Sequence, residues 1–333
     1  MSRTEFQPLP TRAVEQSPSA SVAPPISISF VMDPAVWDSG LCSIPGAHPM
    51  QCWSWGEARR DLGDRVERIM VHQDGEPMLM AQIFLRRLPL GFPCGWVPRG
   101  PVVSRFAGKE VFRAFKSAAR SRGFRLMVVH PYSASGAGAP ALGFRFRQEL
   151  ERTFILDLDR PLDQLEKAFD KDWRYGKNRF AREGGVVIED VTESGVLSLA
   201  EFYSGLVQRK GFRAYGGTDM MLAVFRRFRD FESANVRVHL FRAEVKGEPA
   251  GAILVLRAGN IGHYLWGAFE YKLRNSRVSE GLQWAAICRL RELGATLYDL
   301  EGASEKAPGV MEFKRKMGGL LITLPPKQAC WSW

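Results

Sequence analysis

The sequence has little of what builds a metal site, a disulfide framework or a membrane anchor. Its five cysteines are widely separated and form no CxxC pair, which argues against disulfides and zinc and favours a reducing, cytoplasmic location. The five histidines show no HExxH or HxH spacing, so we expect no metal. No apolar run approaches the roughly 18 residues that cross a bilayer. The N-terminus also lacks the hydrophobic core of a signal peptide.

What the chain does have is length and positive charge. Its 333 residues are enough for about two domains. The formal net charge of +10 favours anionic partners such as nucleic acid, nucleotide-linked intermediates or an anionic membrane surface. A basic surface without any special partner remains the alternative interpretation of the same charge.

The N-terminal part predicts a tail followed by a mixed domain. Residues 1–25 are rich in Pro, Ser and Ala, and we expect a disordered tail there. Domain one is expected over 26–150, with a short helix that carries Trp53 and Trp55. A hairpin follows over 65–72 and 77–85, joined by a Gln-Asp-Gly-Glu turn. The apolar spacing in 109–122 predicts a helix that ends at Gly123, and a buried strand follows over 124–130.

A second domain is expected over 151–325, with a short tail over 326–333. The pattern predicts a strand at 153–158, a basic segment at 171–183 and two helices near 195–210 and 218–230. Three strands joined by glycine-containing turns follow over 236–269. A helix with one apolar stripe is predicted at 278–293, then a short strand from Leu297 and a glycine-closed helix near 312–319. We therefore predict an α/β (α+β) fold in which both units are mixed, mainly antiparallel sheets flanked by helices.

The order of these elements resembles the GNAT acyltransferase topology used twice, and five motifs together resemble the FemABX peptidyltransferase family over roughly residues 48–320. The motifs are Gln51-x-x-x-Trp55-Gly-x-x-Arg59, the Pro98-Arg-Gly-Pro101 turn, Arg174-Tyr-Gly-Lys-Asn-Arg-Phe-Ala181, Tyr298-Asp-Leu-x-Gly302, and Phe313-Lys314 with Gly318-Gly319.

The resemblance implies two tandem GNAT-like domains and transfer of an amino acid from aminoacyl-tRNA to an amino group of a peptidoglycan precursor. It implies no metal and no redox cofactor. The expected partners are aminoacyl-tRNA and a UDP- or lipid-linked muropeptide. A lipid-linked acceptor would bring the protein to the membrane as a peripheral protein, and the sequence leaves this open.

Acyl transfer to an amine needs an anchored donor, an anchored nucleophile and a stabilised oxyanion. Lys314 is the leading candidate for the oxyanion, since the resemblance places the Phe313–Lys314 pair near the acyl-transfer centre. A solvated lysine on a helix face is the alternative. Tyr264 is a candidate for substrate contact, with core packing as its alternative. Asp299 lies at a strand end where a substrate-binding carboxylate or general base fits, but a turn or cap role fits equally.

Arg59, Arg174 and Arg179 are candidates for holding the diphosphate of the acceptor, because guanidinium groups bind phosphate in a bidentate manner. The resemblance supplies basic residues at matching positions, with the match falling on either Arg174 or Arg179. A solvated basic helix face is the alternative. Ser104 departs from the family, which often has an acidic residue there. If that carboxylate helps to bind the acceptor in the family, this chain uses another acceptor.

Two other functions compete. An acyl-CoA-dependent N-acyltransferase would cradle the CoA pyrophosphate in a glycine-rich turn before the helix near 278, and 272–279 contains no glycine. A non-catalytic, basic RNA-binding protein would interleave aromatic and basic residues, and only Trp173, Tyr175 and Phe180 do so in the 173–182 segment.

Overall fold

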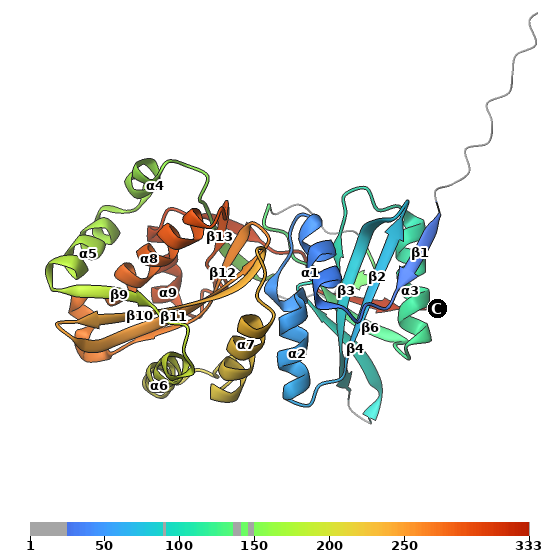
Figure 1. Ribbon diagram of the computed structural model, residues 1–333, viewed down its shortest axis with the longest axis horizontal. Coiled ribbons are helices and arrows are strands. Elements are labelled where there is room, and N and C mark those ends of the chain that lie inside the picture. The colour runs from blue at the N-terminus through green and yellow to red at the C-terminus, as the bar shows by residue number, and fades with distance from the viewer. Residues whose placement is uncertain (1–24, 89–90, 136–140, 146–149, 333) are drawn as a thin grey trace, which may run out of the picture.

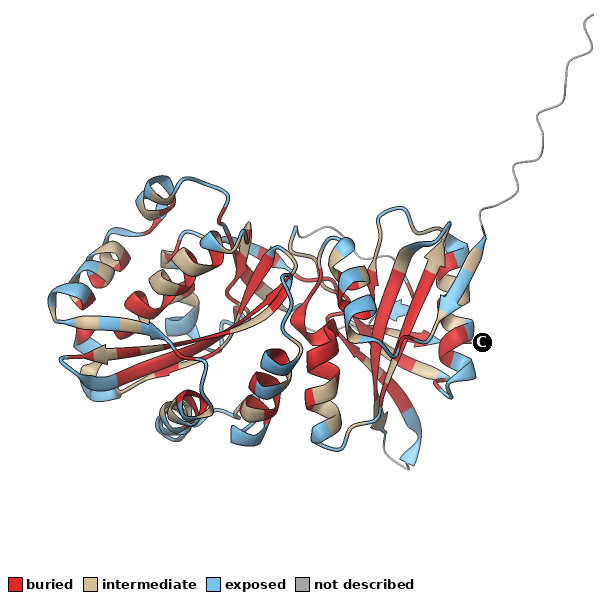
Figure 2. Cartoon of the chain, viewed as in Figure 1, coloured by how far each residue is buried: buried red, intermediate tan, exposed pale blue. Residues whose placement is uncertain are grey.

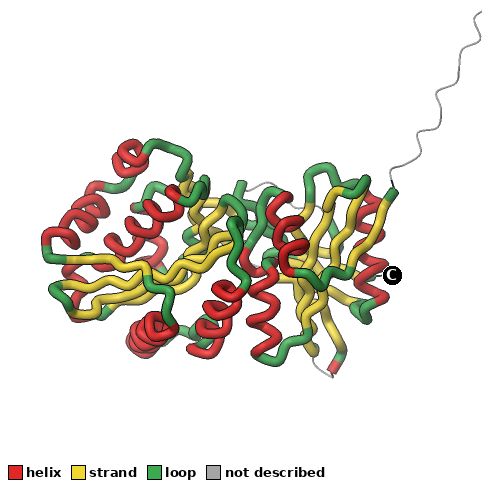
Figure 3. Tube along the Cα trace, viewed as in Figure 1, coloured by secondary structure: helices red, strands yellow, loops and turns green. Residues whose placement is uncertain are grey.

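The computed structural model describes residues 25–88, 91–135, 141–145 and 150–332. It contains two sheets flanked by helices, lying side by side along the long axis of the molecule (Figures 1 and 3). The predicted tail over 1–25 lies, apart from Pro25, outside the described residues. No helix within the described ranges is both long and apolar enough to cross a membrane.

The N-terminal unit is built around an eight-stranded sheet in the order β1-β2-β3-β4-β6-β15-β7, with β5 paired to β3. Strand β15 (Gln328–Trp331) joins it from the far end of the sequence. The β4–β6 pair is parallel and the other pairs are antiparallel. Its elements are β1 (Ile26–Ser29), α1 (Pro34–Ser43), the 3₁₀ turn η1 (Pro49–Gln51), α2 (Trp53–Asp61), β2 (Val66–Gln73), β3 (Glu76–Arg87), β4 (Pro93–Pro98), β5 (Val102–Val103), α3 (Lys109–Ser121), β6 (Leu126–His130) and β7 (Phe144–Arg145).

The predicted hairpin and helix are confirmed in this unit. The β2–β3 turn has Asp74 at φ 54° and Gly75 at φ 82°, both in the left-handed region that a two-residue type I′ turn requires. Helix α3 buries Val111 and Phe115 against the sheet, which explains the apolar spacing.

The C-terminal unit is built around a seven-stranded sheet in the order β14-β8-β13-β12-β11-β10-β9. Its elements are β8 (Arg152–Asp157), α4 (Leu162–Ala168), α5 (Lys171–Arg182), β9 (Gly185–Glu189), α6 (Glu193–Lys210), α7 (Thr218–Asp230), β10 (Val236–Val245), β11 (Glu248–Ala258), β12 (Ile261–Phe269), the 3₁₀ segment η3 (Tyr271–Ser276), α8 (Val278–Glu292), β13 (Leu297–Asp299), α9 (Pro308–Lys316) and β14 (Leu320–Thr323).

Strands β12 and β13 are parallel, and their pairing is brief. Residues 261–263 of β12 pair with 297–299 of β13. Strand β13 then ends at Asp299, whereas β12 continues to Phe269. The chain after Asp299 is therefore free to turn away from the sheet, and this turn builds the candidate site described below.

The C-terminal segment does not form the predicted tail. Strand β15 (Gln328–Trp331) returns to the N-terminal sheet, where it pairs with β6 and β7. Gln328 and Cys330 are fully buried, while Ala329 and Trp331 are less so, as expected for a strand with one covered face. The boundary predicted at 325 is thus corrected: the last strand belongs to the first domain, because it satisfies the backbone groups along the edge of β6.

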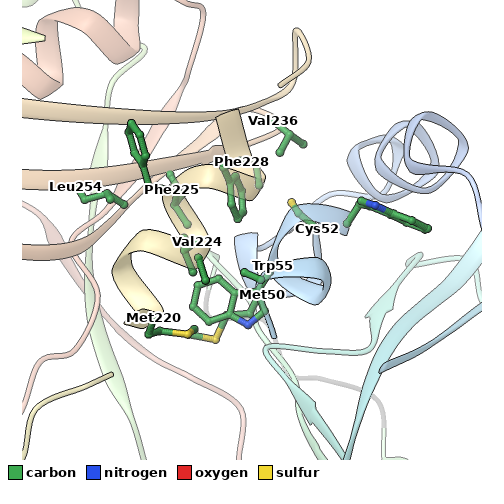
Figure 4. Packing of buried hydrophobic residues seen from close by; sticks show 14 of the residues in the cluster. Met50, Cys52, Trp55, Met220, Val224, Phe225, Phe228, Val236 and Leu254 are labelled. Carbon is green, nitrogen blue, oxygen red and sulfur yellow. The ribbon is translucent and has the colours of Figure 1, made fainter. Parts of the chain in front are cut away.

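The two units share one apolar core. A buried cluster joins Met50 and Trp55 of the first unit to Met220, Val224 and Leu254 of the second (Figure 4). It forms where α2 packs against α7, and the buried stretches of the ribbon meet at this junction in Figure 2. This shared core fixes the position of one unit against the other, so side chains from both can form one site.

Candidate active site

The site is built on the turn that follows β13. Glu301 has φ 51° and Gly302 has φ 35°, so the chain bends sharply after Asp299. A left-handed conformation at a residue other than glycine costs about 1–3 kcal/mol, so it needs support from its surroundings. Part of that support is local, because the Glu301 N–H donates to Asp299 Oδ1 at 2.7 Å. This is the Asx-turn role that the sequence left open for Asp299.

Asp299 is wholly internal. It is 0% exposed, and its Oδ2 accepts from the hydroxyl of Tyr132 at 2.7 Å while Oδ1 also accepts from Thr153. Burial and the neighbouring charge of Glu301 raise the pKa of Asp299. Both oxygens are occupied inside the protein, so the predicted substrate contact of Asp299 is corrected: this carboxyl braces the turn and links it to Tyr132 of the first unit.

The side chain of Glu301 joins the two units. Its Oε1 lies 2.9 Å from His48 Nε2 and 3.1 Å from His263 Nδ1, and its Oε2 lies 3.5 Å from Arg99 Nη2. Burial alone would raise the pKa of Glu301, but hydrogen bonds from the two histidines and the charge of Arg99 hold it well below its usual range. Glu301 is therefore an anion that receives donors from both units.

His48 is neutral in this arrangement. Its Nδ1 accepts the N–H of Met50 at 3.1 Å, which places the ring proton on Nε2, facing Glu301. Burial and the nearby ring of His263 lower the pKa of His48 to about 3. The contact is thus an N–H donor on a carboxylate, and it does not require a charged imidazole.

The same three side chains approach the composition of a metal site. Ligand atoms of His48, His263 and Glu301 lie within 4.8 Å of one another, the one such group that the described part of the chain contains. A metal on Nε2 of His48 would need the proton to move to Nδ1, where it would face the Met50 N–H. The donor set is therefore better satisfied as a hydrogen-bonded network.

Lys314 lies beneath this turn. Its Nζ donates to the carbonyl oxygen of Gly302 at 2.9 Å and to that of Glu301, and the residue is 6% exposed. Burial lowers the pKa of Lys314 to about 8, with the anions of Glu301 and Asp299 opposing that fall. An ammonium has three N–H donors, and among the described residues two acceptors are present. The third N–H has no acceptor among the described residues.

The structure brings some of the other predicted residues to Lys314. Tyr264 packs against the C-terminal core, as its alternative interpretation expects, and its ring lies 5.7 Å from Lys314 Nζ. Its contact with substrate stays a prediction. Burial raises the pKa of Tyr264, which keeps its hydroxyl protonated. Phe313 packs against the same core from α9 and anchors the helix that carries Lys314.

The three candidate diphosphate-binding arginines each have a partner within the protein. Arg59 pairs with Asp64 at the end of α2, beside Met220 of α7. Arg174 donates to the carbonyl of Lys167 at 2.8 Å, and Arg179 pairs with Glu183 one helical turn away at 2.6 Å.

Both of these arginines lie on α5, which packs on α8 at the far end of the second unit from α2 (Figure 1). Arg59 therefore does not share one diphosphate site with Arg174 or Arg179, and a phosphate contact of either α5 arginine stays a prediction. On α5 the interpretation as a largely solvated basic face fits.

The residues that sequence reasoning missed are His48, Arg99, Tyr132 and His263. Arg99 lies in the Pro98–Pro101 turn, and His48 lies just before the motif that begins at Gln51. The residues around each of them form no spacing that would mark a catalytic or binding site. The histidines are 1% exposed in the fold, and only the packing of the two units brings them together.

The start of α8, where an acyl-CoA enzyme would bind pyrophosphate, is filled by the protein itself. A Cβ added at Gly281 would lie 2.3 Å from the ring of Phe180 on α5, and one at Gly176 would lie 2.8 Å from Glu280. Glu280 is buried in the first turn, with Arg277 Nη1 at 3.0 Å. A carboxylate and a packed helix occupy the place that an anion would need.

Comparisons with known proteins agree with this geometry. The acetyltransferase (GNAT) domain family matches residues 167–315. Lipid II:glycine glycyltransferase of Staphylococcus aureus is 22% identical over 372 aligned residues, covering 85% of this chain and 88% of the relative.

Among solved structures, FemX superposes with a TM-score of 0.77 at 17% identity, covering 92% of this chain and 97% of FemX. L-PGS from Bacillus licheniformis gives a TM-score of 0.57 at 16% identity, with 90% and 92% coverage. A tandem GNAT protein of the clavulanic acid pathway gives 0.51 at 12% identity, with 93% and 99% coverage.

The chain thus has the fold of tandem GNAT-like proteins, and its second unit matches the GNAT domain family. The similarity to lipid II:glycine glycyltransferase and to FemX agrees with the FemABX resemblance that the motifs indicated.

Proposed function

We propose that this protein is an aminoacyltransferase that moves an amino acid from aminoacyl-tRNA to an amino group of a peptidoglycan precursor. The observation that carries the proposal is Lys314, a buried ammonium held by two carbonyl oxygens with one N–H left over, on a FemABX fold. The relative from Staphylococcus aureus is named for glycine transfer to lipid II, which supports a cell-wall acceptor.

The reaction follows from these groups. The acceptor amine attacks the ester carbonyl of the aminoacyl-tRNA, and a C–N bond forms while the carbonyl oxygen becomes an oxyanion. The free N–H of Lys314 donates to that oxygen, which stabilises the developing charge in a site that water reaches poorly. The C–O bond to the ribose then breaks, and the proton lost by the amine reaches the ribose oxygen. No cofactor enters this scheme.

The proposal places the protein in the cytoplasm, where aminoacyl-tRNA is made. A UDP-linked acceptor would be met there in solution. A lipid-linked acceptor would require contact with the membrane surface, and the net charge of +10 favours peripheral attraction to anionic lipids.

Transfer from acyl-CoA is the second candidate, and the filled N-terminus of α8 counts against it. The deciding experiment incubates purified protein with a UDP-linked muropeptide and either aminoacyl-tRNA or acetyl-CoA, and follows the product by mass spectrometry. We expect an aminoacylated muropeptide from the tRNA donor alone. Product from acetyl-CoA alone would reject the proposal.

A variant of Lys314 tests the mechanism. Lys314→Met keeps the apolar stem and removes the ammonium, so kcat should fall by about 10²–10³-fold, as expected for loss of an oxyanion donor. Arg315→Ala is the control, because Arg315 lies on the same helix and pairs with exposed Glu312 at 2.7 Å. Single-turnover rates and circular dichroism are measured for both variants. A folded Lys314→Met variant with wild-type kcat would remove Lys314 from the mechanism.

A further inference from the structure

Glu301 lies where three parts of the molecule meet. His48 and Arg99 reach its carboxylate from the first unit, and His263 reaches it from β12 of the second. Its backbone carbonyl, together with that of Gly302, accepts the hydrogen bonds of Lys314. One residue thus connects the packing of the two units to the placement of the ammonium.

We propose that Glu301 is a positioning residue that fixes Lys314 by locking the 299–302 turn to the N-terminal unit. The inference rests on the proposed function for its kinetic readout. In this inference the side chain of Glu301 does not contact the substrate. Its role is to hold the backbone carbonyls that aim the lysine.

The conformation of the turn supports this role. Glu301 adopts φ 51°, which an unsupported glutamate would leave for a lower-energy conformation. The bond from its own N–H to Asp299 holds one side of the bend, and the donors on its carboxylate hold the other. Without the carboxylate the bend loses its attachment to His48 and Arg99, and the two carbonyl oxygens beneath it are free to shift.

The charges around Lys314 give the second part of the argument. Lys314 faces the anions of Glu301 and Asp299, and the ring of Tyr264 lies beside it. Around Glu301 the facing groups are His48, His263 and Arg99, and beyond Arg99 lie His130 at 3.3 Å and Glu151 at 3.1 Å. The anion of Glu301 favours the charged form of Lys314, so its removal lowers the pKa of the lysine.

Glu301→Gln is the test, because it keeps the size of the side chain, removes its charge and sets an NH2 donor against Arg99 where a carboxylate oxygen accepted. We expect kcat to fall by about 10²-fold through misplacement of the ammonium, while KM for both substrates stays within about threefold. The alkaline limb of the pH–rate profile should move to lower pH. Glu305→Gln is the matched control, since Glu305 lies in the same connection, is 73% exposed in its side chain and pairs with Arg152 at 2.8 Å.

A readout without turnover separates this inference from the proposed function. Lysine labelled with ¹³C at Cε reports the protonation of Lys314 by NMR titration, with Lys314→Met identifying the resonance. The pKa of Lys314 should fall in Glu301→Gln and stay unchanged in Glu305→Gln, whichever donor the enzyme uses. An unchanged lysine pKa in Glu301→Gln would overturn the positioning role, even if kcat falls. If the wild-type protein transfers no amino acid from aminoacyl-tRNA, that result rejects the proposed function and leaves the positioning role untouched.

A second variant acts from the other unit, should Glu301→Gln fail to fold. His48→Leu removes the donor to Glu301 from the N-terminal side, and His48→Gln restores an N–H there. We expect kcat to fall at least about tenfold in His48→Leu and to recover largely in His48→Gln, because a misplacement of about 1 Å can cost about 10²-fold at a reacting centre. Equal rates in the folded leucine variant and the wild type would contradict the link between the units.

Discussion

Asp38 is a buried carboxyl far in sequence from the active site. Its Oδ1 accepts the N–H of Trp53 at 2.8 Å, which ties α1 to the start of α2. Burial outweighs that bond and the charge of Arg68, and raises the pKa of Asp38 to about 6. Between pH 3.8 and about 6 the folded chain keeps a proton that the unfolded chain has lost, so the free energy of unfolding falls as pH rises through this window.

Asp38→Asn should therefore stabilise the protein at neutral pH. The amide oxygen keeps the bond to Trp53 without a buried charge, and the expected gain in unfolding free energy is about 1–2 kcal/mol at pH 7.5, shrinking towards pH 4. Urea unfolding at several pH values measures it. Asp74→Asn, in the exposed β2–β3 turn, serves as the control and should change little. A less stable Asp38→Asn variant at pH 7.5 would show that the charge is stabilising.

Single residues also show what the sequence could reveal of the site. Lys314 can be selected as a candidate from the sequence because it stands in a recognisable motif between Phe313 and the glycines that end its helix. His48 and His263 lie 215 positions apart, and no local pattern marks either as a partner of Glu301. Asp299 was assigned to the substrate because its position at a strand end fits both roles, and only burial distinguishes a bracing carboxyl from an exposed one.

At the scale of helices and strands, regular patterns were the most predictable part of the fold. Helices α3 and α8 followed from apolar residues repeated at helical spacing, since each packs one face on a sheet. Helix α1 was missed although Asp33 caps it and Pro34 begins it, because few of its positions are buried. Strand β14 was missed because it is a short strand at the sheet edge, whose pairing depends on a distant segment.

The close packing of α5 on α8 leads to a prediction about two glycines. Gly281 lies in α8 against the ring of Phe180, and an added Cβ would approach the ring within 2.3 Å. Gly281→Ala should lower the free energy of unfolding by about 1–3 kcal/mol through overpacking.

Gly205, in α6, has no atom within 4 Å of an added Cβ and provides the matched control. Gly205→Ala should raise the free energy of unfolding by about 0.5–1 kcal/mol through helix propensity. Chemical denaturation of both variants measures the difference, and equal effects would mean that α5 moves aside without strain.

For the molecule as a whole, the return of β15 to the first sheet makes the chain end part of the N-terminal core. Gln328 is fully buried, and its Oε1 accepts the N–H groups of Leu142 at 2.7 Å and Gly143 at 3.2 Å. Gln328→Ala leaves these donors without that acceptor and should cost about 1–3 kcal/mol of unfolding free energy. Lys327→Ala removes a part-exposed pair with Glu151 and should cost less than about 1 kcal/mol.

Thermal denaturation distinguishes these two neighbours. Gln328→Ala should lower the melting temperature more than Lys327→Ala does. If β15 were disordered in solution, neither substitution would change the melting temperature. A melting temperature of Gln328→Ala equal to that of the wild type would mean that β15 is detached in solution.

The junction of the two units also determines how the protein responds to acid. Burial lowers the pKa of His48 to about 3 and, with Arg99 beside it, that of His130 to about 4. In the unfolded chain both rings bind a proton as pH falls through about 6.5, while in the folded protein they stay neutral. The contribution of the two histidines to the free energy of unfolding is therefore complete above pH 6.5 and is lost as pH drops towards 4. Asp38 has the opposite effect on the free energy of unfolding over part of this pH window. It accounts for one proton, however, and the two histidines account for two.

We therefore expect net destabilisation by acid between pH 6.5 and 4, with each histidine contributing a slope of up to about 1.4 kcal/mol per pH unit. His48→Gln removes one titrating ring and keeps a donor for Glu301. The slope of its unfolding free energy against pH should therefore be lower by up to about 1.4 kcal/mol per pH unit. Urea unfolding across this range, with Asp38→Asn as the background, isolates the histidine contribution. If His48→Gln has the same slope as its background, the ring of His48 is already protonated in the folded protein, and its contact with Glu301 is an ion pair of two buried charges instead of a neutral donor on a carboxylate.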